Sequence, residues 1–307
     1  MKILKGFALV VLSLLLFLSL SVFGIAYTLN STLLNPDFVV DEVEKLDISS
    51  IAGDLLAEQI GENLPEEARF LEGTVSTIVS EIISAQEPWI KEQAGAAIHS
   101  GYDFLLGKSE TLALTISLES LKEDLGASLR ESMKPLIMAS LPPELAKAPQ
   151  ALIDQYVDEF YEQFAGEIPS EIDIDESFIP PEAMVQIIQA RQIIGYFQTG
   201  YYGLIGLMIL LLLVVVLIGR RLRCIALTLG ITFLLYGAIQ YAAVFFGKDI
   251  SLMYLPLHEV PSAVQTWLLS AVDDFIKPLE VFSLGVLAGG IVLLVVSFFV
   301  KPGESAE

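Results

Sequence analysis

Residues 201–223 read YYGLIGLMILLLLVVVLIGRRLR, and this stretch constrains the fold more than any other part of the chain. Residues 203–219 are apolar without interruption, and about 17 to 20 such residues suffice to span a hydrocarbon core roughly 30 Å thick. Tyrosines precede the run and arginines follow it. Tyrosine is enriched at membrane interfaces, and arginine stays on the cytoplasmic side. The stretch therefore predicts a transmembrane helix at 201–219 that ends in the cytoplasm.

Three further apolar runs are long enough to cross a membrane. They lie at residues 7–29, 224–246 and 279–300. The apolar region of a secretory signal peptide is shorter, about 7 to 15 residues, so we interpret the first run as an uncleaved signal anchor. Cleavage at the small-x-small sequence Gly24-Ile25-Ala26 is the alternative. The chain is therefore expected to be a multi-pass protein of the cell membrane with four transmembrane helices.

Basic residues at the ends of these runs predict the direction in which each run crosses the membrane, because positive charge is retained on the cytoplasmic side. They place segments 1–6, 220–223 and 301–307 in the cytoplasm, together with both chain termini. Segments 30–198 and 247–278 are then extracytoplasmic. The residues that determine this topology are Lys2, Lys5, Arg220, Arg221, Arg223 and Lys301.

Acidic charge is concentrated in the larger extracytoplasmic segment. The whole chain has a formal net charge of −21, and residues 29–198 hold 31 Asp and Glu against 9 Lys and Arg. The remaining residues hold 7 acids and 8 bases. So acidic a surface disfavours nucleic acid and anionic lipid as partners of this segment. Besides the lipid bilayer, the partners we expect are another membrane protein or a basic extracytoplasmic molecule.

Most of the acidic segment has the periodicity of helices. Asn35-Pro36-Asp37 is expected to open one helix, because asparagine caps helices and proline is tolerated at the first helical position. Pro88 is expected to break or restart another helix, and Gly107 to end it. Two more helices are expected at about 121–138 and 149–165.

A change to period two marks two short strands in the same segment. Residues 112–118 and 172–175 both alternate between aliphatic and small or polar residues, as half-buried strands do. Because an isolated strand is unstable, we predict that these two strands pair. Pro180-Pro181 then begins a helix that can continue as one long helix through residues 201–219.

The fold class predicted from these patterns is a mainly α membrane protein. It has four transmembrane helices and a mostly helical extracytoplasmic domain that contains a short two-stranded β pair. The smaller outer segment, 247–278, carries an apolar face over residues 264–276. This face predicts an amphipathic helix that lies on the membrane surface or caps the acidic domain.

An acidic run near the end of the acidic segment is a candidate cation site. Glu171, Asp173, Asp175 and Glu176 offer carboxylate oxygens, which are the ligands that divalent cations prefer. The run does not fit an EF-hand, because Phe178 stands where that loop requires glycine. Acids that alternate along a strand also form the solvated face of a strand. Both interpretations stay open.

Each of three other residues could belong to a functional site or could have no chemical role. His99 and His258 are the only histidines, and they could meet carboxylates in a metal or proton site or lie apart on the surface. Cys224 is the only cysteine, so no intrachain disulfide can form. It follows Arg223 at the membrane boundary, where palmitoylation is one interpretation and an inert thiol is the other.

Small residues in the last apolar run suggest where helices approach closely. Gly285 and Gly289 form a small-xxx-small pattern, which is typical of helix packing in membranes. We expect these glycines to pack against the other transmembrane helices of the same chain. Dimerisation of two chains through this face is the alternative.

The sequence lacks the features that are typical of several function classes. No Asp, Glu, Lys, Arg or His lies in the middle of any apolar run, where ion-coupled transporters and proton relays normally place such residues. No P-loop, GxSxG, HExxH or CxxC pattern occurs, although these patterns mark common phosphate-binding, hydrolytic and metal or redox sites. We therefore expect neither a cofactor nor enzymatic activity.

Three short segments resemble a group of uncharacterised prokaryotic membrane proteins. They are LNPDFV at 34–39, PWIKEQ at 88–93 and ISLESLK at 116–122. The resemblance covers about the first 220 residues. It implies an N-terminal span, an acidic helical ectodomain and C-terminal spans, and it implies no particular activity.

The leading functional hypothesis is a non-enzymatic, membrane-anchored extracytoplasmic interaction or sensing module. A channel or transporter accessory subunit is the alternative, in which the acidic domain concentrates cations at a pore mouth. A third interpretation is a membrane-bound hydrolase that uses carboxylates of the acidic domain.

Overall fold

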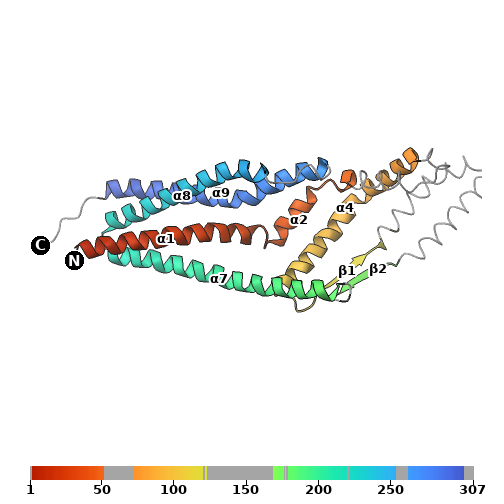
Figure 1. Cartoon of the computed structure of the whole chain (residues 1–307), viewed down its shortest axis with the longest axis horizontal. Coiled ribbons are helices and arrows are strands. Elements are labelled where there is room, and N and C mark those ends of the chain that lie inside the picture. Colours follow the sequence, from red (N-terminus) through yellow and green to blue (C-terminus); the bar gives the residue numbers. More distant parts are fainter. Residues whose placement is uncertain are drawn as a thin grey trace, which may run out of the picture. The chain divides into compact units, whose positions relative to one another are not determined.

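The computed structural model of the chain describes residues 2–51, 72–119, 122, 169–175, 177, 179–219, 221–253 and 262–300. Within this part the chain is mainly helical and contains one two-stranded sheet (Figure 1). The elements are α1 (Lys2–Ser31), α2 (Pro36–Glu44), α4 (Glu72–Leu105), β1 (Ala113–Ser117), β2 (Glu171–Asp175), α7 (Pro181–Gly219), α8 (Leu222–Met253) and α9 (Ser262–Phe299).

The chain divides into two compact units. The span unit comprises Met1–Val39, Gln189–Val260 and Gln265–Glu307, and the acidic unit comprises Val40–Ile188 and Pro261–Val264. Helices α2, α7 and α9 each have residues in both units. Each of these three helices therefore crosses the boundary between the two units in sequence.

Four helices are long and apolar enough to cross a membrane, by length and composition. This confirms that the four predicted apolar runs form helices of spanning length. Their apolar side chains are largely exposed, which is typical of helices whose surroundings are lipid. The four segments are Leu4–Ser31, Pro181–Gly219, Leu222–Lys248 and Ala263–Phe299.

Two of these helices extend well beyond their apolar runs. Helix α7 runs unbroken over Pro181–Gly219, so the predicted long helix is confirmed. Helix α9 (Ser262–Phe299) contains Pro278. It thereby joins the amphipathic segment to the fourth apolar run, although the sequence predicted two separate elements.

Pro88 also lies inside a helix, and the prediction that it breaks or restarts α4 is wrong. Proline removes one backbone hydrogen bond, and its ring clashes with the preceding turn. Polar contacts of α4 lie one turn beyond Pro88. Lys91 Nζ forms an ion pair with Glu87 at 2.6 Å and donates to the Glu44 carbonyl oxygen at 2.8 Å. The helix is thus held to α2 one turn beyond the proline.

The predicted helix ends and strand pairing are confirmed where the structure describes them. The Asp37 backbone N–H donates to Asn35 Oδ1 at 3.2 Å, as expected for a capped helix start. Gly107 has a φ of 75° just after α4 ends, a conformation that glycine adopts readily. Strands β1 and β2 pair antiparallel. The helices expected at about 121–138 and 149–165 lie outside the described residues.

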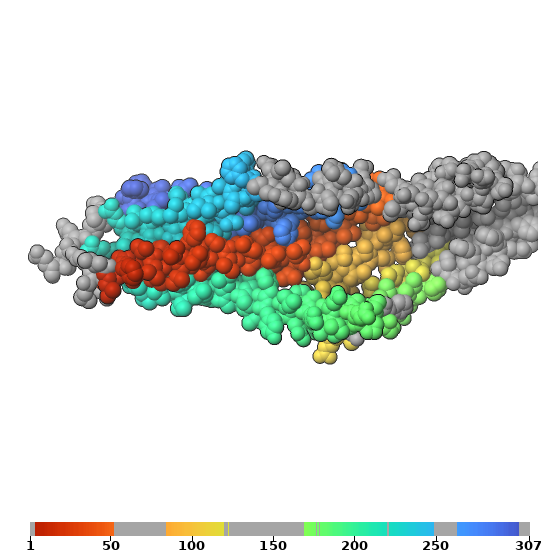
Figure 2. Space-filling view, viewed as in Figure 1, coloured from red at the N-terminus to blue at the C-terminus, as the bar shows by residue number. Residues whose placement is uncertain are grey.

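The interior of the span unit is built from α1, α7 and α8. In the view of Figures 1 and 2, α1 (red) lies between α8 (cyan) and α7 (green). Aromatic contacts connect α9 to this interior, since the Phe282 ring lies 5.4 Å from Phe23 and 6.1 Å from Tyr236. The buried core side chains are Leu16, Leu20, Leu211, Val215, Leu229 and Tyr236.

Helices α8 and α9 approach each other at glycines. A Cβ on Gly237 would lie 2.7 Å from the Leu287 backbone, and a Cβ on Gly290 would lie 2.5 Å from the Leu234 backbone nitrogen. Backbone atoms at this distance leave no room for a side chain, and small residues are what permit such close helix packing in membranes. Gly237 and Gly290 therefore bring the two helices together.

The glycines predicted for this role do not take part in it. A Cβ on Gly285 or Gly289 would meet no atom within 4 Å, so the expected packing against the rest of the chain is not found among the described residues. Gly290 packs instead. One residue turns an α-helix by about 100°, so Gly289 and Gly290 project toward different surroundings.

Candidate functional site

The predicted acidic residues of β2 lie on one face of the sheet. Glu171, Asp173 and Asp175 are exposed, whereas Ile172 and Ile174 are partly buried. This alternation follows from the two-residue period of a strand. We call Glu171, Asp173 and Asp175 the acidic face. The residues opposite them on β1 are Ser117, Thr115 and Ala113.

Hydroxyl groups hold two of these carboxylates. The Thr115 hydroxyl donates to Asp173 Oδ1 at 2.6 Å. Asp175 Oδ1 accepts from the Ser177 hydroxyl and from the Ser177 backbone N–H at 2.8 Å. These hydrogen bonds from Ser177, the hydroxyl first, hold the pKa of Asp175 below its usual value, because they favour the charged carboxylate.

Ser177→Ala is expected to raise the pKa of Asp175 toward the usual aspartate value of about 3.9. A carboxylate whose pKa is lower in the folded state than in the unfolded chain stabilises the fold at pH values above its unfolded-state pKa. This stabilisation is lost as the pH falls through the pKa of the folded state. The variant should therefore lose less stability between neutral and strongly acidic pH. NMR titration of ¹³C-labelled aspartate side chains measures the pKa, with Ser170→Ala as the control. An unchanged Asp175 titration in Ser177→Ala would contradict the assignment.

The acidic face does not form a metal site with the other described residues, among which no three His, Cys, Asp or Glu side chains are grouped to hold a metal ion. Neighbours on one face of a strand are about 7 Å apart. Cation binding by Glu171, Asp173 and Asp175 alone therefore has no support from neighbouring described ligands. Glu176 lies outside the described residues, and cation binding that includes it stays a prediction.

The other candidate residues are not brought together. His99 is exposed on α4, while His258 lies outside the described residues, so a site shared by the two histidines stays a prediction. Cys224 is partly buried in the first turn of α8. Arg223 beside it is exposed, and palmitoylation of the thiol also stays a prediction.

The basic residues that predict topology are partly described. Lys5, Arg221 and Arg223 are exposed. Lys2 begins α1, and Arg220 and Lys301 lie outside the described residues. Those topology-determining residues that the structure describes therefore lie at the N-terminal ends of α1 and α8.

Near the C-terminal end of α8, ion pairs connect this helix to α9. Lys248 Nζ lies 3.3 Å from Asp273 Oδ1 and 3.4 Å from Glu280 Oε2. Asp273 is largely exposed and Glu280 is partly buried. The ion pair with Lys248 accounts for an acidic residue next to the fourth apolar run, which the sequence alone left unexplained.

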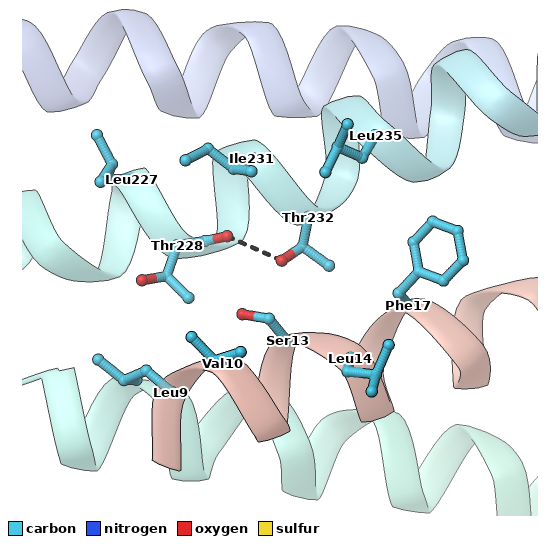
Figure 3. A pocket seen from close by; sticks show the side chains of 10 residues that line it. All are labelled: Leu9, Val10, Ser13, Leu14, Phe17, Leu227, Thr228, Ile231, Thr232 and Leu235. Carbon is cyan, nitrogen blue, oxygen red and sulfur yellow. Dashed lines mark hydrogen bonds between the residues drawn. The ribbon is translucent and has the colours of Figure 1, made fainter. Parts of the chain in front are cut away.

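A groove of about 460 Å³ lies between α1 and α8 (Figure 3). Its lining comes from residues 9–17 of α1 and 227–235 of α8 and is apolar except for three hydroxyl side chains. Figure 3 shows Ser13, Thr228 and Thr232 pointing into the space between the two helices. The sequence signal for this groove was weak, because its lining differs little in composition from the rest of the apolar runs.

The hydroxyls of the groove differ in their hydrogen bonding. Thr232 Oγ1 donates to the Thr228 carbonyl oxygen at 2.9 Å, a bond within the helix. The hydroxyls of Ser13 and Thr228 form no hydrogen bond with any described residue. A hydroxyl in apolar surroundings is stabilised by an acceptor, so these two groups are available to a molecule in the groove.

No protein family, curated protein or solved structure matches the chain. The class of the protein therefore follows from its own structure. Four apolar helices of spanning length are compatible with a multi-pass membrane protein, and this one also contains a small antiparallel sheet.

Proposed function

We propose that the chain is a non-enzymatic, membrane-anchored interaction or sensing module whose acidic unit lies outside the cytoplasm. The observation that carries this proposal is the separation of charge between the units. Within Val40–Ile188 there are 30 acidic and 8 basic residues, a net charge of −22. The span unit holds 8 acidic and 9 basic residues.

The orientation rests on the exposed cations. Lys5, Arg221 and Arg223 follow the rule that positive charge near span ends remains in the cytoplasm. With these residues inside, α1 leads outward to the acidic unit and α7 returns from it. The cytoplasmic segments are then only a few residues long, so a signal would have to pass through a partner in the membrane.

The chemistry of the acidic unit favours a basic partner. Exposed carboxylates such as those of the acidic face attract positive charge, raise the rate of encounter and make binding sensitive to salt. The four apolar runs have no charged residue in their middle regions, where groups that couple transport to ions are normally placed. Interaction through the acidic unit therefore fits better than transport.

Cysteine mapping in intact cells tests this function. In a Cys224→Ser background, single cysteines replace Ser109, Ser170, Ser262 or Ser305, and a membrane-impermeant thiol reagent is applied. Labelling is expected at the first three positions and absent at Ser305. A thiol-linked photo-cross-linker at Ser109 or Ser170 is then expected to capture a basic protein, with less capture at high salt.

Two outcomes would contradict the proposal. Labelling at Ser305 alone would mean that the acidic unit faces the cytoplasm. Correct topology without any captured partner, combined with a cation-dependent conductance of the purified chain in liposomes, would favour a channel or transporter accessory subunit instead. Permeabilised cells, in which Ser305→Cys must become labelled, provide the control for reagent access.

A further inference from the structure

We infer that the groove between α1 and α8 binds one acyl chain of an anionic phospholipid, whose phosphate group is held by Lys5 and Arg223. This site belongs to the span unit alone. It requires only that α1 and α8 stand in a bilayer, and it depends neither on the partner of the acidic unit nor on which side of the membrane that unit lies.

The register of the two helices places both cations at one end of the groove. Lys5 precedes Leu9 by four residues, and Arg223 precedes Leu227 by four residues. Residues four apart lie on the same helix face, about 6 Å apart along the axis. Leu9 and Leu227 line the groove, so each cation lies about one turn beyond a lining residue at this end of the groove. Lys5 also lines a smaller pocket with Leu217 and Ile218 of α7.

The structure shows no anionic partner for either cation within the residues that it describes. Both are exposed, and neither forms an ion pair with any residue in the described part of the chain. The sequence contains no Asp or Glu in residues 1–36 or 183–248. The phosphate of an anionic lipid supplies the missing charge at the depth where juxtamembrane Lys and Arg lie.

The length of the groove fits a lipid chain rather than a helix of another protein. Residues 9–17 and 227–235 each rise by about 12 Å, and the turn that leads to the cations adds about 6 Å. One leaflet of the hydrocarbon core is about 15 Å thick. A partner helix would instead need a groove as long as the whole membrane is thick.

Aromatic side chains mark the inner end of the groove. Phe17 lines the groove, and its ring packs edge-to-face on Tyr236 at a centroid distance of 6.0 Å. Tyr236 is almost fully buried. The occupant therefore enters from the end with Lys5 and Arg223 and stops near the middle of the span.

A hydroxyl in the groove suits the polar part of a lipid chain. Thr228 lies five residues beyond Arg223, a rise of about 7.5 Å, and its hydroxyl has no hydrogen-bond partner among the described residues. An acyl ester carbonyl lies just below the phosphate of a phospholipid and accepts hydrogen bonds. The Thr228 hydroxyl is placed to donate one.

Photo-cross-linking with defined lipids tests the site. The full chain is reconstituted in phosphatidylcholine nanodiscs with a trace of phosphatidylglycerol or phosphatidylcholine that carries a diazirine on its acyl chain. Cross-links from phosphatidylglycerol are expected in peptides 9–17 and 227–235, roughly tenfold above those from phosphatidylcholine. Replacing both cations, Lys5→Gln with Arg223→Gln, is expected to reduce this excess to the phosphatidylcholine level.

A charge control and a steric variant separate the site from general attraction to anionic lipid. Arg191→Gln removes one positive charge from α7, ten residues before its apolar run, and it should leave the cross-links unchanged. Ser13→Phe fills the groove, leaves both cations in place and should abolish the cross-links. Unaltered helical content and gel filtration are required of each variant.

The inference is overturned by equal groove labelling from the two lipids, or by labelling of wild type only outside the groove. It is also overturned if Arg191→Gln lowers the labelling as much as the double replacement of Lys5 and Arg223 does. None of these results bears on cysteine accessibility in the acidic unit, so failure of the lipid site and failure of the proposed function are distinguishable.

Discussion

Gly290→Ala is expected to destabilise the packing of α8 on α9 by about 3 kcal/mol, whereas Gly289→Ala should be neutral or slightly stabilising. A Cβ on Gly290 would lie 2.5 Å from the Leu234 nitrogen and 3.0 Å from the Gly230 carbonyl oxygen. Both are backbone atoms, so the helices must separate. A Cβ on Gly289 meets nothing within 4 Å, and alanine favours helix by up to about 1 kcal/mol relative to glycine.

The two substitutions change the same residue type at adjacent positions, so each serves as the control for the other. Unfolding by sodium dodecyl sulfate in mixed micelles, followed by tryptophan fluorescence, measures the difference. Gly237→Ala should resemble Gly290→Ala, because its Cβ would approach the Leu287 backbone. If Gly289→Ala and Gly290→Ala unfold at the same detergent fraction, then α8 and α9 are not packed as described.

Gly24→Ala is expected to destabilise the span unit by about 1 to 3 kcal/mol, and Tyr236→Phe is expected to relieve much of this loss. A Cβ on Gly24 would lie 2.5 Å from the Tyr236 hydroxyl oxygen. The Tyr236 side chain is almost fully buried and cannot move aside easily. Phenylalanine lacks this oxygen, although Leu279 Cδ1, at 3.1 Å from the same Cβ position, still crowds the site.

Tyr236→Phe alone should be neutral or stabilising. The Tyr236 hydroxyl is buried and has no hydrogen-bond partner among the described residues, and removing an unsatisfied buried group carries no penalty of its own. A double-mutant cycle of Gly24→Ala and Tyr236→Phe isolates the coupling of the two positions. Strictly additive losses would mean that α1 and α8 do not meet at this point.

The architecture could be predicted where a pattern depends on nearby residues. Uninterrupted apolar runs indicated the four spanning helices, because length and hydropathy are sufficient for that purpose. The alternation at 112–118 and 172–175 indicated two strands, and because these were the only such runs in the acidic segment, each was the natural partner of the other. The acidic face of β2 followed from the same alternation.

Features that depend on distant contacts could not be predicted. Pro88 and Pro278 cost helix stability locally, and the sequence pattern alone did not indicate that α4 and α9 continue through them. In α9 the glycine that approaches the α8 backbone is Gly290, whereas the sequence pattern indicated Gly285 and Gly289. Because that helix is apolar on all sides, its hydrophobic pattern does not indicate which face meets α8. The groove could not be predicted for the same reason, because its apolar lining resembles every other lipid-facing surface.

The length of helix α7 has a structural consequence. Its 39 residues correspond to a rod about 58 Å long, of which a bilayer core takes up about 30 Å. The helix is therefore about twice as long as a bilayer core requires, it has no break in its secondary structure, and its first residues belong to the acidic unit. A single element of secondary structure can therefore cross a bilayer and also supply residues to the acidic unit.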